Sequence, residues 1–482
     1  MRATNPFLIL LLISVESFAA PSLEFERCLA TQGARQIDAL CATLERAENP
    51  KQPDGKQIQL SIIKLPSRSA QPKADAFTLI QGGPGGSSIS MAIAYDALLE
   101  GVRTDRDVLV VDQRGTGRSN ILACPELEPD SFIGDFDVDE IKKHSEACVQ
   151  SIDSDLRYYT TSIAVQDLDA VRAAAGYPRL TIYGVSYGTR VAQHYLRRFE
   201  KNTRAVILDG VAHVGLNLAG GEIARQSQIA FDTLAKRCAE STECKDQFGD
   251  IKLKLGELLI RLDKQAVELR IADPISGEMV DKKLVAEDVL GVIRLMAYST
   301  EQNALLPMLI SYAHAGNYHP LAAQSLMIGE DFLKDYATGM NNTVMCAEDQ
   351  PYVSAFDLTD LENTYLGDKM AQAIKAICSV WPRGPIDEDF HQPFSSSVPV
   401  LILSGETDPI TPPSNGEYAH DMFSNSKHII VPSHGHGVWT RGCVPQLSLN
   451  FIEQASFEDI NTACIERENA MPFFNNTAGP KP

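Results

Sequence analysis

The feature that most constrains the fold is an alternation of short apolar runs with amphipathic helical stretches in the first half of the chain. Three runs, "AFTLIQ" (76–81), "DVLVVDQ" (107–113) and "LTIYG" (180–184), are almost continuously apolar, as expected for strands buried on both faces. Apolar residues at helical spacing follow in 162–176 and 187–200. The alternation predicts a mostly parallel sheet with helices packed against it.

A long helical block interrupts this pattern, and strand-like runs return near the C-terminus. Further β-rich runs lie at 58–65, 204–210, 398–405 and 426–435. Between these two groups, helical stretches dominate and strand-like runs are few. We therefore expect a helical cap inserted at 212–395 into an α/β core formed by 21–211 and 396–482.

The N-terminus has the pattern of an export signal. Arg2 supplies positive charge, the run "FLILLLISV" is too short to span a bilayer, and Ala19 and Ala20 offer small residues for cleavage. An uncleaved anchor is the alternative. We expect residues 1–20 to be removed, leaving a periplasmic or secreted protein with no membrane association. The net charge of -20 would repel a phosphate backbone and argues against a nucleic-acid partner.

The cysteine count fits an oxidising compartment. All ten cysteines follow the expected cleavage point, and the number is even. They form no Cys-x-x-Cys pair and no Cys/His cluster with zinc spacing, so we expect no metal and no cofactor. Neighbour pairing is the simplest connectivity, although the sequence alone does not decide it: Cys28–Cys41, Cys124–Cys148, Cys238–Cys244, Cys346–Cys378 and Cys443–Cys464.

A serine stands between two glycines where an apolar run meets a helical one. Gly184, Ser186 and Gly188 form a G-x-S-x-G pattern that follows the run at 180–184 and opens the helix at 187–200. This strand-turn-helix context is typical of a nucleophile elbow, which exposes the serine hydroxyl above the sheet. The alternative is a tight structural turn.

The base and the acid that a serine nucleophile needs follow in the order expected for this kind of fold. Asp408 comes after the run at 398–405, and His436 comes after the next run. The carboxyl ends of parallel strands meet at one edge of a sheet, so both residues should lie beside Ser186. Asp209 is the rival acid and His434 the rival base, because each also follows a strand-like run.

A glycine-rich loop offers backbone donors for an oxyanion. In "LIQGGPGGSS" (79–88), Gly82 or Gly83 is expected to donate one amide and Tyr187 the other. Phosphate binding is the alternative, but no Gly-Lys-Ser/Thr ending follows. The charged stretch "VVDQRGTGRSN" (110–120) is interpreted as structural, with arginines that tie loops together and an aspartate that caps a turn.

Five motifs together resemble the α/β-hydrolase peptidases of the proline iminopeptidase and tripeptidyl aminopeptidase type. They are "QGGPGGS", "DQRGTGRS", "GVSYGTR", "LSGETDPITP" and "SHGHG", and their order and spacing match over roughly residues 55 to 465. The cysteines and the extended C-terminal portion resemble the exported tripeptidyl aminopeptidase branch. The resemblance implies a helical cap, no metal, and hydrolysis near a peptide N-terminus. Many relatives begin the oxyanion loop with histidine or with Asn-Pro, whereas this chain has Gln81, and this departure bears on the donor geometry there.

An aminopeptidase must also bind a free α-amine, for which an acidic residue in the cap is suited. The resemblance points to Glu348 and Asp349, which follow Cys346 in "NNTVMCAEDQPY"; the alternative is a solvated acidic turn. The leading hypothesis is an exported serine exopeptidase acting on peptides. An exported carboxylesterase with the same triad is the alternative, and a non-catalytic binding protein on the same scaffold is a third.

Overall fold

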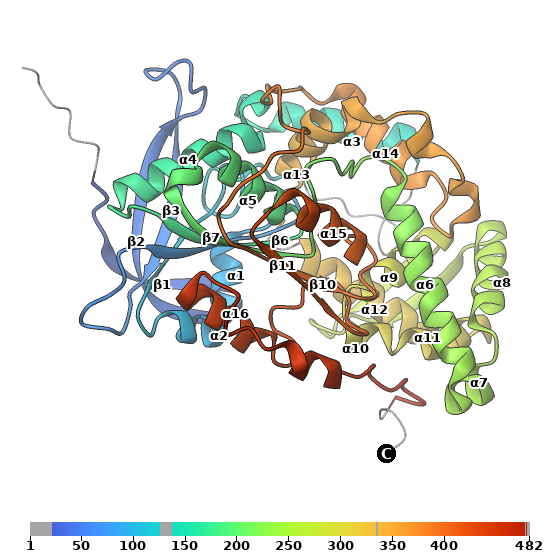
Figure 1. Ribbon diagram of the computed structural model, residues 1–482. Coiled ribbons are helices and arrows are strands. Elements are labelled where there is room, and N and C mark those ends of the chain that lie inside the picture. The colour runs from blue at the N-terminus through green and yellow to red at the C-terminus, as the bar shows by residue number, and fades with distance from the viewer. Residues whose placement is uncertain (1–21, 126–136, 334–335, 478, 480–482) are drawn as a thin grey trace, which may run out of the picture.

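The computed structural model describes residues 22–125, 137–333, 336–477 and 479, so the expected export signal at 1–20 lies outside the described residues. Nine strands of this part of the chain form one sheet in the order β1-β2-β3-β5-β4-β6-β7-β10-β11 (Figure 1). The six strands from β5 to β11 in that order run parallel, and β1, β2 and β3 are antiparallel. The strands are β1 Glu26–Gln32, β2 Arg35–Ala47, β3 Gln57–Leu65, β4 Ala76–Ile80, β5 Asp107–Val111, β6 Leu180–Val185, β7 Thr203–Asp209, β10 Val400–Gly405 and β11 Ser426–Val431.

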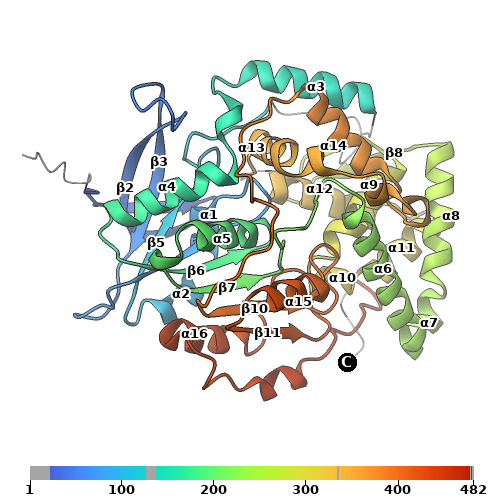
Figure 2. The same ribbon diagram turned by 45° about the horizontal axis from the view of Figure 1, so that its top comes forward.

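Helices cover both faces of this sheet, because the central strands are apolar on both sides. In β6 every residue is buried; Ile182 faces one hydrophobic cluster, and Tyr183 and Val185 face another. The first cluster takes residues from α4, α5 and α15, and the second from α1, α2 and α16 (Figure 2). The bounds are α1 Ser88–Ala94, α2 Asp96–Val102, α3 Val138–Ser151, α4 Thr161–Ala174, α5 Tyr187–Arg198, α15 Pro413–Met422 and α16 Val444–Gln454. The predicted α/β architecture, a mostly parallel sheet with helices on both faces, is confirmed.

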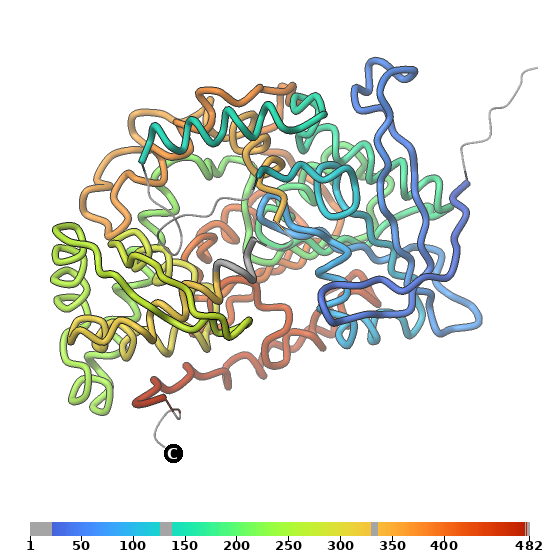
Figure 3. The backbone as a smooth tube through the Cα atoms, turned by 180° about the vertical axis from the view of Figure 1, so that it is seen from behind, coloured from blue at the N-terminus to red at the C-terminus, as the bar shows by residue number. Residues whose placement is uncertain are grey.

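The chain between β7 and β10 holds two groups of helices. The first group, with a small antiparallel pair of strands, has a hydrophobic cluster of its own. It lies on the opposite side of the molecule from the N-terminal strands (Figure 3). Its elements are α6 Glu222–Glu240, α7 Thr242–Phe248, α8 Ile251–Lys264, β8 Val267–Ala272, β9 Met279–Leu284, α9 Ala286–Met296, α10 Thr300–Asn303, α11 Leu306–His314 and α12 His319–Leu333.

The second group packs on the main core. It comprises α13 (Thr338–Val344), a π-helical turn at Met345–Asp349 and α14 (Lys369–Val380). Its residues Met340, Val344 and Cys346 belong to the cluster beneath α4 and α5. The 212–395 segment, predicted as one cap, therefore contains a part with its own core and a part that completes the core of the sheet.

All five expected disulfides are present, namely Cys28–Cys41, Cys124–Cys148, Cys238–Cys244, Cys346–Cys378 and Cys443–Cys464. Each closes a loop of 6 to 32 residues in sequence separation, which restricts the unfolded chain and stabilises the fold. Within the described ranges, no helix combines the length and the apolar character that crossing a bilayer requires.

Candidate active site

Ser186 lies at a sharp turn between β6 and α5, and the two glycines beside it have a steric explanation. A Cβ on Gly184 would come within 2.4 Å of the Gly188 carbonyl oxygen, and a Cβ on Gly188 within 2.2 Å of the Ile80 carbonyl oxygen. Only glycine lets the two strands and the helix approach this closely. Ser186 itself has φ 57° and ψ -128°, a strained backbone conformation that costs about 1–3 kcal/mol. Its amide donates to the Asp209 carbonyl at 2.9 Å, which holds the turn in place.

Asp408 and His436 form a hydrogen-bonded pair in loops that follow β10 and β11. Asp408 Oδ2 lies 2.7 Å from His436 Nδ1. The Asp408 carboxylate is itself fixed, because Oδ1 accepts from the amides of Ile410 and Thr411, both at 2.9 Å, and the Thr411 hydroxyl donates to Oδ2. With Nδ1–H donating to Asp408, Nε2 is the nitrogen left to accept a proton. Both side chains are almost fully buried, at 8% exposed for His436 and 0% for Asp408.

The hydrogen-bonded pair of Asp408 and His436 raises the pKa of the imidazole. Burial by itself lowers the pKa of His436, but the charge of Asp408 and its hydrogen bond outweigh burial, so the pKa lies above its usual value of 6.5. The charge of Asp209 acts in the same direction, and that of Arg294 in the opposite one. A basic imidazole of this kind is suited to take a proton from a hydroxyl.

The rival residues have other partners. Asp209 accepts from the Tyr183 hydroxyl and from the amides of Val438 and Trp439, so it holds the loop that carries His436. His434 is buried, and its Nδ1 lies 2.8 Å from the carbonyl oxygen of Pro432. Neither residue replaces Asp408 or His436 in the hydrogen-bonded pair.

The glycine-rich loop lies against the serine. A Cβ on Gly82 would come within 2.6 Å of Ser186 Cβ and 3.3 Å of Oγ, so this loop passes beside the hydroxyl. The Gly82 amide, however, donates to the Gln81 side-chain oxygen at 2.9 Å. Among the described residues, the amides of Gly83 and Tyr187 have no hydrogen-bond partner. Of the two predicted glycine donors, Gly83 is therefore the one with a free amide.

A cavity of about 570 Å³ joins these groups. Its lining includes Ser186, His436 and the glycine-rich loop, together with residues of α6, α9 and α14. Most of the lining is apolar. Among its described residues there is no carboxylate, and the cations are His436, when protonated, and Arg294.

Glu348 and Asp349, predicted to bind a substrate amine, do not line this cavity. Both are 0% exposed. Asp349 forms two hydrogen bonds with the Arg190 guanidinium, at 2.8 and 3.1 Å, and Glu348 accepts from the amide and hydroxyl of Thr161, at 2.6 and 2.9 Å. Burial raises the pKa of Glu348 to about 7. This placement does not fit the predicted role, because each carboxylate already has protein partners and no path to a substrate.

Glu348 and Asp349 instead contact α4 and α5, next to the turn that carries Ser186. Arg190 is one helical turn after Ser186 on α5 and is 1% exposed, so it requires an anion beside it. The Thr161 hydroxyl bonded to Glu348 also lies 2.5 Å from the Tyr187 hydroxyl. The acidic turn therefore anchors the helix that carries both the serine and the neighbouring donor.

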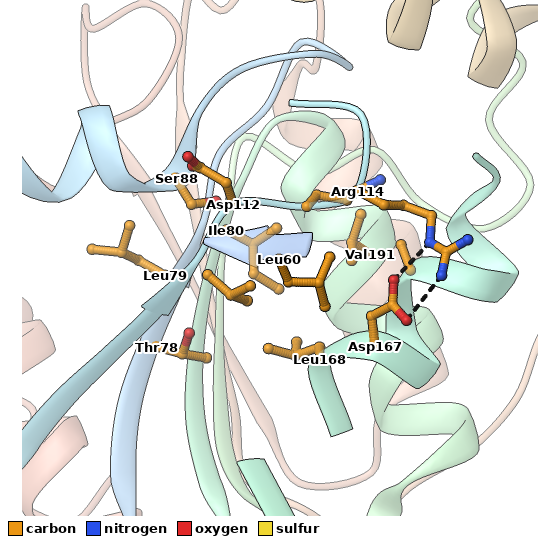
Figure 4. A pocket seen from close by; sticks show the side chains of 13 residues that line it. Leu60, Thr78, Leu79, Ile80, Ser88, Asp112, Arg114, Asp167, Leu168 and Val191 are labelled. Atoms are coloured by element: carbon orange, nitrogen blue, oxygen red, sulfur yellow. Dashed lines mark hydrogen bonds and ion pairs between the residues drawn. The ribbon is translucent and has the colours of Figure 1, made fainter. Parts of the chain in front are cut away.

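The charged stretch at 110–120 is structural, as interpreted. Arg114 is fully buried and holds Asp167 with two hydrogen bonds beside a small cavity of about 20 Å³ (Figure 4). Asp112 accepts from the Ser87 hydroxyl, which caps α1, and from the amides of Ile89 and Arg118. These contacts hold the start of α1, just after the glycine-rich loop.

Sequence reasoning missed two residues near the imidazole. Thr411 bonds to Asp408 three positions earlier, and a hydroxyl at that spacing after an aspartate is a local signal that was available. Tyr298 packs edge-on against the His436 ring with 5.0 Å between centroids, and its carbonyl accepts from the His436 amide. No local pattern marks Tyr298, because it follows α9 in the inserted segment.

Comparisons with known proteins confirm the predicted α/β-hydrolase fold. The family model for the α/β-hydrolase fold matches residues 75–262, which include Ser186, and the model for TAP-like proteins matches 363–464, which include Asp408 and His436. The chain is 25% identical over 435 residues to "Serine protease Hip1" of Mycobacterium tuberculosis, covering 82% of each protein.

Two further relatives carry different names. The chain is 23% identical over 420 residues to "Tripeptidyl aminopeptidase" of Streptomyces coelicolor, covering 80% of this chain and 75% of that protein. It is also 30% identical over 224 residues to "Carboxylesterase B" of Mycobacterium tuberculosis, covering 43% of each.

Proposed function

We propose that this chain, a serine hydrolase with the α/β-hydrolase fold and a TAP-like C-terminal region, is an exported exopeptidase with Ser186, His436 and Asp408 as its triad. The observation that carries the triad is the 2.7 Å hydrogen bond between Asp408 and His436, with His436 and Ser186 lining the same cavity. The five disulfides support export to an oxidising compartment.

The proposed reaction follows from the positions of these groups. His436 Nε2 takes the proton of the Ser186 hydroxyl as the oxygen attacks the scissile carbonyl carbon, and the resulting imidazolium is stabilised by Asp408. The amides of Gly83 and Tyr187 donate to the oxyanion. His436 then gives the proton to the leaving amine as the C–N bond breaks, which leaves the acyl group on Ser186. A water molecule attacks this ester while His436 takes its proton, and His436 returns the proton to the Ser186 oxygen as the acid product leaves.

The exopeptidase part of the proposal is supported by the relatives named tripeptidyl aminopeptidase and by the inserted helices α6, α9 and α14, which contribute residues to the cavity lining. With Glu348 and Asp349 engaged elsewhere, a free α-amine would have to be bound by backbone carbonyls or neutral side chains of the cavity. A carboxylesterase is the second candidate, favoured by the absence of a carboxylate among the described lining residues and by the relative of that name.

A panel of chromogenic substrates separates these candidates. Tripeptidyl p-nitroanilides with free and with acetylated N-termini are compared with p-nitrophenyl esters, using wild type and Ser186→Ala. The proposal expects hydrolysis of the free-amine anilides at a kcat/KM at least tenfold above that of the acetylated ones. Equal hydrolysis of both would remove the exopeptidase assignment, and hydrolysis of esters alone would favour the carboxylesterase.

A further inference from the structure

The described part of the cavity wall carries one permanently charged side chain, Arg294, on the last turn of α9. Its Nη2 donates to the Tyr298 hydroxyl at 3.2 Å, and the guanidinium lies 5.8 Å from the centroid of the same ring. Its Nε is buried and has no hydrogen-bond partner. An arginine stays protonated at any relevant pH, so this corner of a mostly apolar cavity holds a cation with unused donor capacity.

Three fully buried arginines of this protein are neutralised, whereas Arg294 is partly exposed in the cavity wall. Arg106, Arg114 and Arg190 are all at most 1% exposed, and each bonds to an aspartate, Asp75, Asp167 and Asp349 respectively. Within the described residues, no carboxylate lies within ion-pair distance of Arg294. A guanidinium withdrawn from water gains most from an anion that can accept from its planar fork. Among the described residues, Arg294 therefore has unused capacity to bind an anion that enters the cavity.

The position of Arg294 places such an anion close to the reacting groups. Tyr298, which holds the guanidinium, packs on the His436 ring and accepts from the His436 amide at 2.9 Å. Arg294 is therefore separated from the imidazole by one aromatic side chain, inside the cavity that holds Ser186. A substrate bound at Ser186 would reach it with a group near the scissile bond.

We propose that Arg294 is a specificity residue that binds a carboxylate of the substrate. This inference deepens the proposed function and rests on it: the preferred substrates would be peptides with an acidic side chain near the cleaved bond and otherwise apolar residues. The apolar remainder of the lining, including Met91, Ile223 and Met370, suits the rest of such a substrate.

The test compares substrates that differ only in charge. Tripeptidyl p-nitroanilides carrying Glu or Gln at each of the three positions are assayed with wild type, Arg294→Met and Arg294→Lys. Rates are measured at a pH where His436 is neutral, so a change in its pKa does not enter. Arg270→Met, at an exposed site on β8, removes the same charge from elsewhere and serves as the matched control.

Wild type should prefer Glu to Gln at one position by about tenfold to a hundredfold in kcat/KM. Arg294→Met should remove that preference while changing the Gln substrate little, and Arg294→Lys should retain part of it. If wild type shows no preference at any position, or if Arg294→Met slows both substrates equally, the inference is wrong, because a residue that only supports Tyr298 would affect all substrates alike.

A second substrate pair separates this inference from the proposed function. Mono-p-nitrophenyl glutarate and p-nitrophenyl valerate differ by a terminal carboxylate and need no peptidase activity. If the enzyme cleaved esters but no peptide, the exopeptidase proposal would fail, and a preference for the glutarate ester that depends on Arg294 would still support the anion site. If wild type preferred neither the Glu peptides over the Gln peptides nor the glutarate ester over the valerate ester, the anion site would be refuted, and the exopeptidase proposal would be unaffected.

Discussion

Replacing Asp349 with asparagine tests whether this acid supports the fold or binds substrate. The substitution keeps the shape of the side chain and removes the charge that faces Arg190 across two hydrogen bonds of 2.8 and 3.1 Å. Breaking one side of a buried ion pair typically costs about 3–5 kcal/mol, since the remaining charge stays desolvated. Glu348, 4.0 Å from Arg190 Nη1, would offset part of this, so we expect the lower end, about 3 kcal/mol.

That loss can be converted to a melting temperature. With an unfolding entropy of about 2.1 cal/mol/K per residue, a chain of 482 residues changes its Tm by about 1 °C per kcal/mol. Asp349→Asn should therefore lower the Tm by about 3 °C in scanning calorimetry. The exposed Asp421→Asn is the matched control and should leave the Tm unchanged.

The kinetic result decides between the two roles. If Asp349 is structural, Asp349→Asn should change kcat/KM by the same factor for free-amine and acetylated substrates. The catalytic rate of the folded fraction should change little. A normal Tm together with a loss of kcat/KM confined to free-amine substrates would refute the structural assignment and restore the predicted amine anchor.

Two further predictions concern the imidazole and the glycine-rich loop. The pKa of His436 is raised above 6.5, and the ring must be neutral to accept a proton, so activity should fall as the pH drops through that pKa. The acid limb of the kcat/KM profile should have its midpoint above 6.5. A midpoint of about 5 would contradict the pairing with Asp408. Gly82→Ala would place a methyl group 2.6 Å from Ser186 Cβ, so kcat should fall by about a hundredfold with a folded protein by circular dichroism. Normal turnover in that variant would show that the loop does not lie against the serine.

The sheet and the loops that hold the candidate triad could be predicted because their signals are local. Continuous apolar runs identify strands buried on both faces, and Asp408 and His436 each follow such a run directly. The strands β1 and β2 were not predicted, because β1 at the sheet edge and β2 beside it consist mostly of exposed and partly buried residues without a clear apolar pattern. The strands β8 and β9 were also missed; they are six residues each and form a separate pair among the helices of the inserted segment.

The structural role of Glu348 and Asp349 could not be predicted from the sequence, because it depends on a contact between distant segments. Glu348 and Asp349 look like a solvated or ligand-binding turn until Arg190, 159 positions before Asp349, is known to be buried against them. Arg294 carries no sequence signal of a role in the site. Its helix is amphipathic, and only the packing of α9 over the cavity shows that this residue faces the site.

The central claim is that Ser186 is the nucleophile of this cavity, and covalent labelling tests it most directly. A fluorophosphonate should modify Ser186 in wild type, as located by peptide mass spectrometry, and Ser186→Ala should lose both the label and turnover by about 10⁴-fold or more. Ser90 lines the same cavity and is the matched control, so Ser90→Ala should keep labelling and most activity. Labelling at another serine, or near-normal turnover by Ser186→Ala on any substrate that wild type cleaves, would contradict the account.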